Sequence, residues 1–82
     1  MFTVYALSSE KRSYIYVGLT TNLEKRLTAH NRGYERTTKP YKPFKLIYTE
    51  EYSTRAEARS REKQLKSGVG KSFLKSIEEK SE

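Results

Sequence analysis

Residues 2–19, with the sequence FTVYALSSEKRSYIYVGL, decide the fold of this 82-residue chain. Apolar, aromatic and β-branched side chains, which favour strands, fill both ends of this stretch, and a polar run at 8–13 separates them. The pattern predicts an antiparallel β-hairpin with strands at 2–7 and 14–19.

The length of the polar run predicts how the two strands pair. Six loop residues would place Leu7 opposite Tyr14, so that paired residue numbers sum to 21. Tyr5 would then face Tyr16. Because side chains alternate along a strand, one face of the first strand carries Phe2, Val4 and Ala6, and the other carries Thr3, Tyr5 and Leu7.

The middle of the chain predicts one helix and one further strand. The tetrapeptide TNLE at 21–24 fits a capping box, which opens a helix at about 22–31 that stops near Gly33. A loop with two prolines follows at 33–43 and is long for so small a domain, which often signals function. A third strand is expected at 44–49.

The last third of the chain predicts two helices. A second capping box, TRAE at 54–57, opens a helix that runs to about Lys66, and the run GVG at 68–70 ends it. A short helix follows at 72–79. Its inward residues are expected to be Phe73, Leu74 and Ile77. The order β-β-α-β-α-α predicts an α+β fold, a small three-stranded antiparallel sheet flanked by helices.

Length and composition limit the function classes. We expect one domain over 1–82, with a core at about 2–77. Only 34% of the residues are hydrophobic, too few for a deep apolar pocket, while the 12% that are aromatic can supply a core. The lack of cysteine excludes disulfides, thiolate metal sites and a cysteine nucleophile. No apolar run reaches membrane length and no basic signal segment opens the chain, so we expect a cytoplasmic protein.

The net charge of +7 predicts a polyanionic partner. Residues 32–45 and residues 55–71 each carry a net charge of +4. Tyr34 and Tyr41 lie among the cations of the first stretch and offer flat faces for stacking on bases. Nucleic acid is therefore the favoured partner, with the solvated surface charge of a small protein as the alternative.

A carboxylate stands where the second predicted helix should face the sheet. Ala58, Glu62 and Leu65 recur at helical spacing and form one stripe. Burying an ionised glutamate is unfavourable without a cation, a metal ion or several hydrogen-bond donors. Glu62 is therefore the ion-pair partner of a nearby arginine, a side chain that reaches water at the margin of the stripe, or a metal ligand in a shallow cleft.

Two more polar residues share the apolar face of the first helix. Arg26 and His30 lie one turn apart beside Leu23 and Leu27. Arg26 could pair with Glu62, and His30, the only histidine, could cap the helix C-terminus, where the dipole favours a cation. Two tyrosines that face each other on a hairpin are commonly packing residues without a chemical role. Phenols that meet an arginine, a histidine and a glutamate would instead supply proton transfer and phosphate contacts.

Together these residues resemble a known family. The triplets Thr3-Val4-Tyr5 and Tyr16-Val17-Gly18, ten residues apart, are similar to the two signature triplets of the GIY-YIG nucleases. Arg26 and His30 follow at matching positions, and ARSREKQLK at 58–66 resembles the family's helix with its single essential glutamate. The similarity covers nearly the whole chain. It is greatest to small stand-alone proteins that resemble the N-terminal nuclease domain of bacterial excinuclease C.

The resemblance implies an endonuclease that hydrolyses DNA phosphodiester bonds with one divalent ion, Mg²⁺ or Mn²⁺, held by Glu62. Tyr5 or Tyr16, with His30, would orient or deprotonate the attacking water, and which phenol is the base stays open. Arg26 would stabilise charge on the phosphate. The pathway, DNA repair among others, stays open as well.

Binding to DNA, or to RNA, would be mainly electrostatic with little base readout. Gly18 would let the backbone approach the substrate. The residues expected to contact nucleic acid are Gly18, Arg32, Arg36, Lys39, Lys42, Arg59 and Lys66. No protein partner can be deduced.

Two features depart from the family pattern. Thr3-Val4 stands in place of Gly-Ile, and no asparagine follows Asn31, whereas many active members have one after the essential glutamate. The alternatives are therefore a nucleic-acid-binding module with weak or no catalysis, and a basic RNA- or ribosome-associated protein. The joint presence of the site residues favours the enzyme, because binding alone needs no carboxylate against the phosphates.

Overall fold

The computed structural model describes residues 1–80 and has a three-stranded antiparallel sheet. The strands are β1 (Phe2–Ser9), β2 (Ile15–Thr20) and β3 (Phe44–Tyr52), and β1 lies in the centre of the order β2-β1-β3. The third strand extends beyond the predicted segment, to Tyr52.

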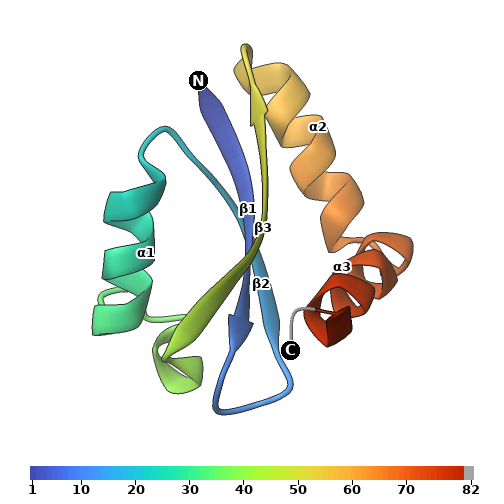
Figure 1. Ribbon diagram of the computed structural model, residues 1–82. Coiled ribbons are helices and arrows are strands. Elements are labelled where there is room, and N and C mark those ends of the chain that lie inside the picture. Colours follow the sequence, from blue (N-terminus) through green and yellow to red (C-terminus); the bar gives the residue numbers. More distant parts are fainter. Residues whose placement is uncertain (81–82) are drawn as a thin grey trace.

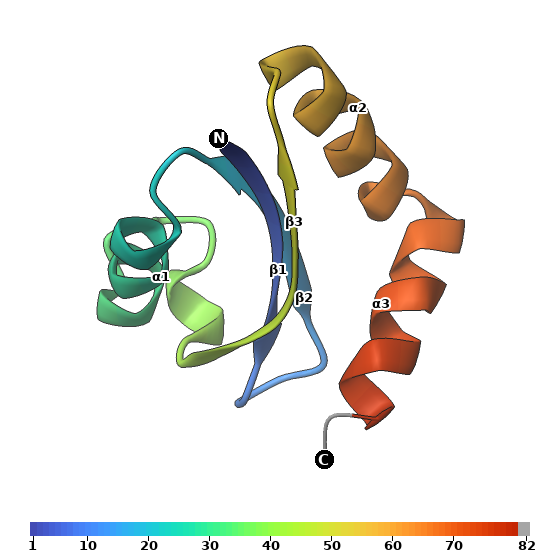
Figure 2. The ribbon, with the colours of Figure 1, turned by 45° about the horizontal axis from the view of Figure 1, so that its top comes forward.

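Helices cover both faces of this sheet (Figure 1). Helix α1 (Leu23–Arg32) lies on one face, and α2 (Arg55–Lys66) and α3 (Gly68–Lys80) lie on the other, as the turned view in Figure 2 also shows. A short 3₁₀ helix, η1 (Lys39–Tyr41), lies in the loop before β3. The predicted α+β class and element order are confirmed. Over residues 1–80, the helices are too short or too polar to cross a membrane.

The two strands of the hairpin pair in a register that is shifted by two residues from the predicted one. Tyr5 lies opposite Gly18 rather than Tyr16, so paired numbers sum to 23. The turn is tighter than predicted because the Ser9 N–H donates to the Tyr14 carbonyl at 2.9 Å. The Ser9 hydroxyl also accepts from two following backbone N–H groups at 3.0 and 3.1 Å. A shift of two residues leaves every side chain on its predicted face.

The sheet separates two apolar clusters. Against α2 and α3 the buried residues are Val4, Ala6, Val17, Ala58, Leu65 and Leu74. Against α1 they are Tyr5, Leu7 and Phe44. Successive side chains of β1 thus enter opposite clusters, which confirms the predicted alternation and places Tyr5 under α1.

The capping box predicted for α1 is wrong by one residue. Asn22, not Thr21, is the N-cap, and its side-chain oxygen accepts from the Lys25 N–H at 3.1 Å. The predicted stop near Gly33 is confirmed, because Gly33 adopts the left-handed conformation (φ 78°) and closes the helix. The second capping box is confirmed, with Thr54 as the N-cap of α2.

The predicted end of the second helix at about Lys66 is confirmed, but the prediction that the run at 68–70 separates it from a helix at 72–79 is wrong. Helix α3 begins at Gly68, and only Ser67 separates it from α2. A Cβ on Gly70 would lie 2.2 Å from the Gln64 carbonyl oxygen and 2.5 Å from the Leu65 Cα. Glycine is therefore needed at 70 because the two helices touch there, and not because a helix stops.

The prediction that Phe73 of α3 points inward is also wrong. Leu74 is buried and Ile77 is half-buried, as expected. Phe73 is 42% exposed, and its ring meets the edge of β3 at Tyr48, with 5.4 Å between the ring centroids. Phe73 therefore lies at the margin of the contact between α3 and the sheet.

Candidate active site

Tyr5 lies at the centre of the α1 face, and its side chain is fully buried. Its ring covers Gly18 on the neighbouring strand. A Cβ on Gly18 would lie 2.5 Å from the Tyr5 hydroxyl and 2.9 Å from the ring of Tyr16. The second triplet thus contains glycine because the tyrosine of the first triplet fills that space. This packing role was missed by sequence reasoning, which assigned Gly18 to nucleic acid.

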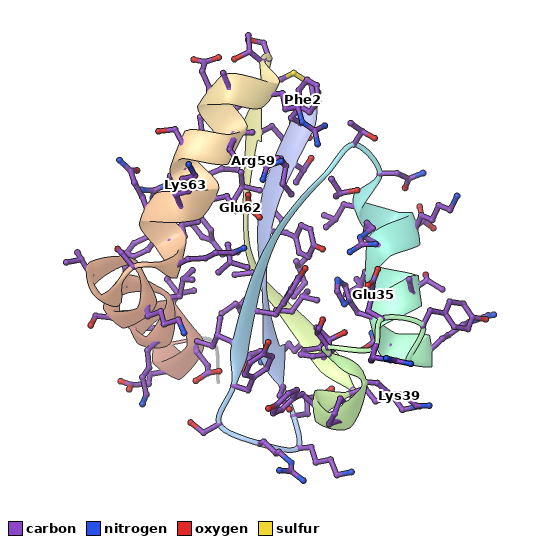
Figure 3. All side chains as sticks on the ribbon, turned by 180° about the vertical axis from the view of Figure 1, so that it is seen from behind. Phe2, Glu35, Lys39, Arg59, Glu62 and Lys63 are labelled. Carbon is purple, nitrogen blue, oxygen red and sulfur yellow. The ribbon has the colours of Figure 1, made fainter. Side chains whose placement is uncertain are left out.

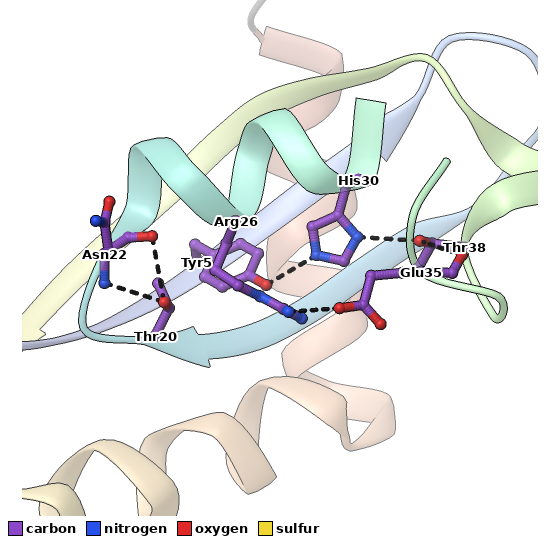
Figure 4. A network of polar contacts seen from close by, with 7 residues as sticks. All are labelled: Tyr5, Thr20, Asn22, Arg26, His30, Glu35 and Thr38. Atoms are coloured by element: carbon purple, nitrogen blue, oxygen red, sulfur yellow. Dashed lines mark hydrogen bonds and ion pairs between the residues drawn. The ribbon is translucent and has the colours of Figure 1, made fainter. Parts of the chain in front are cut away.

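A chain of hydrogen bonds runs from Tyr5 through His30 into the loop before β3 (Figure 4). The Tyr5 hydroxyl lies 2.9 Å from His30 Nε2, and His30 Nδ1 lies 3.0 Å from the Thr38 hydroxyl. The Thr38 hydroxyl donates to the Glu35 carbonyl at 3.4 Å. Thr38 therefore accepts from Nδ1–H, which leaves Nε2 to accept the Tyr5 proton. We assign His30 the Nδ1–H tautomer on this basis.

His30 is fully buried, so its interpretation as a simple cap of the α1 C-terminus is wrong. Burial lowers the pKa of the imidazole, the positive charge of Arg26 lowers it further, and Glu35 opposes these effects. A neutral imidazole is also what the hydrogen-bond chain requires. His30 therefore holds the Tyr5 hydroxyl in place and does not face bulk water.

Arg26 lies beside the Tyr5 hydroxyl and pairs with Glu35 (Figure 4). The pairing with Glu62 considered from the sequence is therefore wrong, because the loop supplies a nearer carboxylate. Hydrogen bonding to Tyr5 raises the pKa of Arg26, burial lowers it, and Glu35 adds to the rise. The side chains of Arg26 and Glu35 are 34% and 35% exposed, so a ligand can reach the pair.

The two phenols of the site differ in their environment. Burial raises the pKa of Tyr5 to about 12, although Arg26 opposes that rise. Tyr16 is only half-buried, and its ring centroid lies 6.1 Å from that of Tyr5 and 4.8 Å from that of His30. Solvent reaches Tyr16 but not Tyr5.

Glu62 lies on α2 and points toward the sheet (Figure 3). It is 8% exposed, which confirms the predicted stripe. Two cations of the same helix hold its carboxylate, with Arg59 Nε at 3.8 Å and Lys66 Nζ at 3.3 Å. The ion-pair interpretation of Glu62 is thereby confirmed. The metal-ligand interpretation is compatible with it, because both cations are more than half exposed and can move.

The site residues come from both faces of the sheet. Tyr5, Tyr16, Arg26 and His30 gather under α1, whereas Glu62 comes from α2, which packs on β1 and β2. Among residues 1–80, neither a hydrogen bond nor an ion pair joins Glu62 to those four. The two groups can act together only on a ligand that reaches both sides of the edge strand β2.

The donors present limit the metal ions that could bind. Within the described part of the chain, no three carboxylate or imidazole side chains converge. Glu62 would thus be the main protein ligand. Mg²⁺ is commonly bound by one or two carboxylates, with waters and substrate phosphate oxygens completing its octahedron. A single carboxylate such as that of Glu62 is within what Mg²⁺ accepts from a protein.

All of the predicted nucleic-acid contacts except Gly18 are exposed, whereas Gly18 is buried under the Tyr5 ring. Arg59 lies on α2 and Lys39 lies on the α1 side of the strands, and both are visible in Figure 3. The predicted contacts that are exposed cations are Arg32, Arg36, Lys39, Lys42, Arg59 and Lys66. Exposed positive charge is therefore present on the α2 side, at Arg59, and on the α1 side, at Lys39 (Figure 3).

The two tyrosines expected to stack on bases differ in how accessible their rings are. Tyr34 is 71% exposed. Tyr41 stacks on Tyr14 with 3.9 Å between ring centroids, and the Arg12 guanidinium lies 5.9 Å from its ring centroid. The expectation of an open stacking face is therefore wrong for Tyr41, because the hairpin turn packs against it.

Sequence reasoning missed Thr38 and passed over Glu35 as a site residue. Both lie in the irregular loop at 33–43, where no strand or helix periodicity shows which side chains point inward. The unusual length of that loop was the only available signal.

Comparison with known proteins identifies a family. A family model described as the GIY-YIG catalytic domain matches residues 1–75. The chain is 38% identical over 78 residues to a UPF0213 protein of Staphylococcus haemolyticus, covering 94% of each chain. It is 40% identical over 79 residues to a UPF0213 protein of Clostridium perfringens, covering 95% of this chain and 84% of that one. No solved structure matches.

Proposed function

The chain belongs to the GIY-YIG family, which has a nuclease-type fold, and on this premise we propose that it is a metal-dependent endonuclease that cleaves DNA. The supporting observation is the series of hydrogen bonds from Tyr5 through neutral His30 to Thr38. These bonds fix a phenol beside a partly exposed arginine. Binding alone does not require such a buried network. Donors held in place before the reaction are what stabilise charge that develops in a transition state.

Arg26 is the residue proposed to bind the scissile phosphate. Its guanidinium stays charged at any relevant pH and offers paired donors to two phosphate oxygens. Tyr5, which His30 fixes by a hydrogen bond, contacts the guanidinium from the buried side, so that Arg26 needs little reorganisation as negative charge grows on the phosphate.

Tyr16 is the phenol proposed to orient the attacking water or to accept its proton. It is the half-buried member of the pair, so water can reach it, whereas the Tyr5 hydroxyl is buried and engaged with His30. Tyr5 and His30 are then positioning residues. This assignment separates the roles of the two phenols, which the sequence left open.

Glu62 would hold Mg²⁺ or Mn²⁺ on the α2 side of β2. When bound, the ion would supply Lewis-acid stabilisation of the leaving 3′ oxygen. Arg59 and Lys66, which neutralise the carboxylate in the free protein, would then pair with phosphates of the bound strand.

The test compares Glu62→Gln with the wild-type protein on supercoiled, nicked and branched DNA in Mg²⁺ and in Mn²⁺. Glu57→Gln on the same helix is the matched control, since glutamine also serves in the capping box at Thr54. We expect Glu62→Gln alone to lose cleavage while it still binds DNA. Equal nicking by all three proteins would indicate contamination and overturn the proposal.

One observation favours a second candidate, a nucleic-acid-binding module without useful catalysis. The carboxylate of Glu62 and the guanidinium of Arg26 both have oppositely charged partners in the free protein. DNA binding by the wild-type protein without any cleavage in either metal would support this candidate over the enzyme.

A further inference from the structure

The loop before β3 places a carboxylate on the arginine to which the proposed function assigns the phosphate. Glu35 pairs with the Arg26 guanidinium and is the only ion-pair partner of Arg26 in the described residues. About a third of each side chain is exposed. The pair is thus neither a sealed core contact nor a fully solvated one, and an anion arriving from solvent meets it directly.

Backbone bonds hold Glu35 in this position. Its carbonyl oxygen accepts from the Thr38 N–H at 3.2 Å, from the Lys39 N–H at 2.9 Å and from the Thr38 hydroxyl at 3.4 Å. The turn is therefore held through the main chain, and the Glu35 side chain can rotate away while Thr38 still supports His30. Breaking the ion pair need not disturb the bond between His30 and Tyr5.

A carboxylate and a phosphodiester make the same kind of contact with a guanidinium. Each presents two anionic oxygens to paired N–H donors. A carboxylate left against Arg26 would also repel the oxygens of an incoming phosphate at close range. Both effects mean that the Glu35 carboxylate and a phosphate exclude each other at this place.

We propose that Glu35 is a built-in competitor for the phosphate. It holds Arg26 in place in the free protein and is displaced when nucleic acid binds. The inference rests on the proposed function in one respect, the identification of Arg26 as the phosphate ligand. The affinity of the site for nucleic acid is then limited by the Glu35 carboxylate, so that only a polyanion with further contacts to the surrounding cations displaces it.

The test measures binding of a fluorescein-labelled DNA duplex by anisotropy, at low ionic strength and without divalent metal. We expect Glu35→Gln to bind about two- to fivefold more tightly than wild type, the range that corresponds to an exposed ion pair. Glu24→Gln is the matched control, because it removes the same charge from exposed α1 surface. Equal gains in the two variants, or weaker binding by Glu35→Gln, would overturn the inference.

A double-mutant cycle shows whether the gain in DNA affinity on replacing Glu35 acts through Arg26. In an Arg26→Gln background, Glu35→Gln should bind no more tightly than Glu24→Gln in that background. A gain that persists without Arg26 contradicts the inference. Because no metal is present, these results do not depend on cleavage. A protein that never cleaves DNA can still show the Glu35 effect, and an active nuclease can lack it.

Discussion

The Tyr5 hydroxyl and His30 Nε2 lie 2.9 Å apart although 25 residues separate them in the chain. One comes from the central strand and the other from α1, so this bond joins the sheet to the helix that covers it. Both side chains are fully buried, and His30 is kept neutral there. The testable consequences concern this bond, the two phenols and two closely packed glycines.

Stability should fall as the pH drops below the ordinary histidine value. Burial, followed by the charge of Arg26, lowers the pKa of His30 in the folded state, so the unfolded chain binds the proton more readily. The stabilising contribution is complete above about pH 6.5 and is lost below it, by at most about 1.4 kcal/mol per pH unit.

Denaturant titrations from neutral to mildly acidic pH measure this loss, and His30→Gln is the control. Because His30 is the only histidine, the variant should have a flatter pH dependence over this range, whatever its stability at neutral pH. An unchanged slope in the variant would show that other groups cause the acid sensitivity.

The same substitution should act differently on the two phenols. Tyr16→Phe should lower the single-turnover cleavage rate, on the order of 10²- to 10⁴-fold if this phenol handles the proton. Tyr5→Phe should instead lower the free energy of unfolding by about 1–3 kcal/mol, because buried His30 loses its partner. Rates are compared where both variants are folded, and a larger loss of rate in Tyr5→Phe would reverse the assignment.

Gly18→Ala should destabilise the hairpin by about 1–3 kcal/mol, since its Cβ would lie 2.5 Å from the Tyr5 hydroxyl. The penalty should be smaller in a Tyr5→Val background, where the ring is absent. Thermal unfolding of the four proteins gives this coupling directly. Equal penalties in the two backgrounds would mean that the clash is with something other than Tyr5.

Gly70→Ala should loosen the contact between α2 and α3, again by about 1–3 kcal/mol, because its Cβ would meet main-chain atoms that cannot turn aside. Gly68→Ala is the matched control, since nothing lies within 4 Å of a Cβ there. Alanine at 68 should be neutral or stabilise the helix by up to about 1 kcal/mol. Similar effects of the two variants on the denaturation midpoint would refute the packing explanation.

Local features of the fold follow from short stretches of sequence. Alternation along residues 2–7 assigned Tyr5 and Val4 to opposite faces, and this assignment survived an error of two residues in register. Helical spacing placed Glu62 against the sheet. Glycine was harder to interpret, because Gly33 ends a helix by its left-handed conformation whereas Gly70 allows two helices to touch.

Amino-acid order by itself determined which side chains share a face, because strand and helix periods are properties of the local backbone. It also determined the surplus of positive charge. Only the tertiary structure decided which distant groups meet: Tyr5 with His30, Arg26 with Glu35 rather than Glu62, and Thr38 with the buried imidazole. The first contact depends on how α1 packs on the sheet, and the other two depend on the path of the irregular loop after α1. Both follow from packing and hydrogen bonding that no local period encodes.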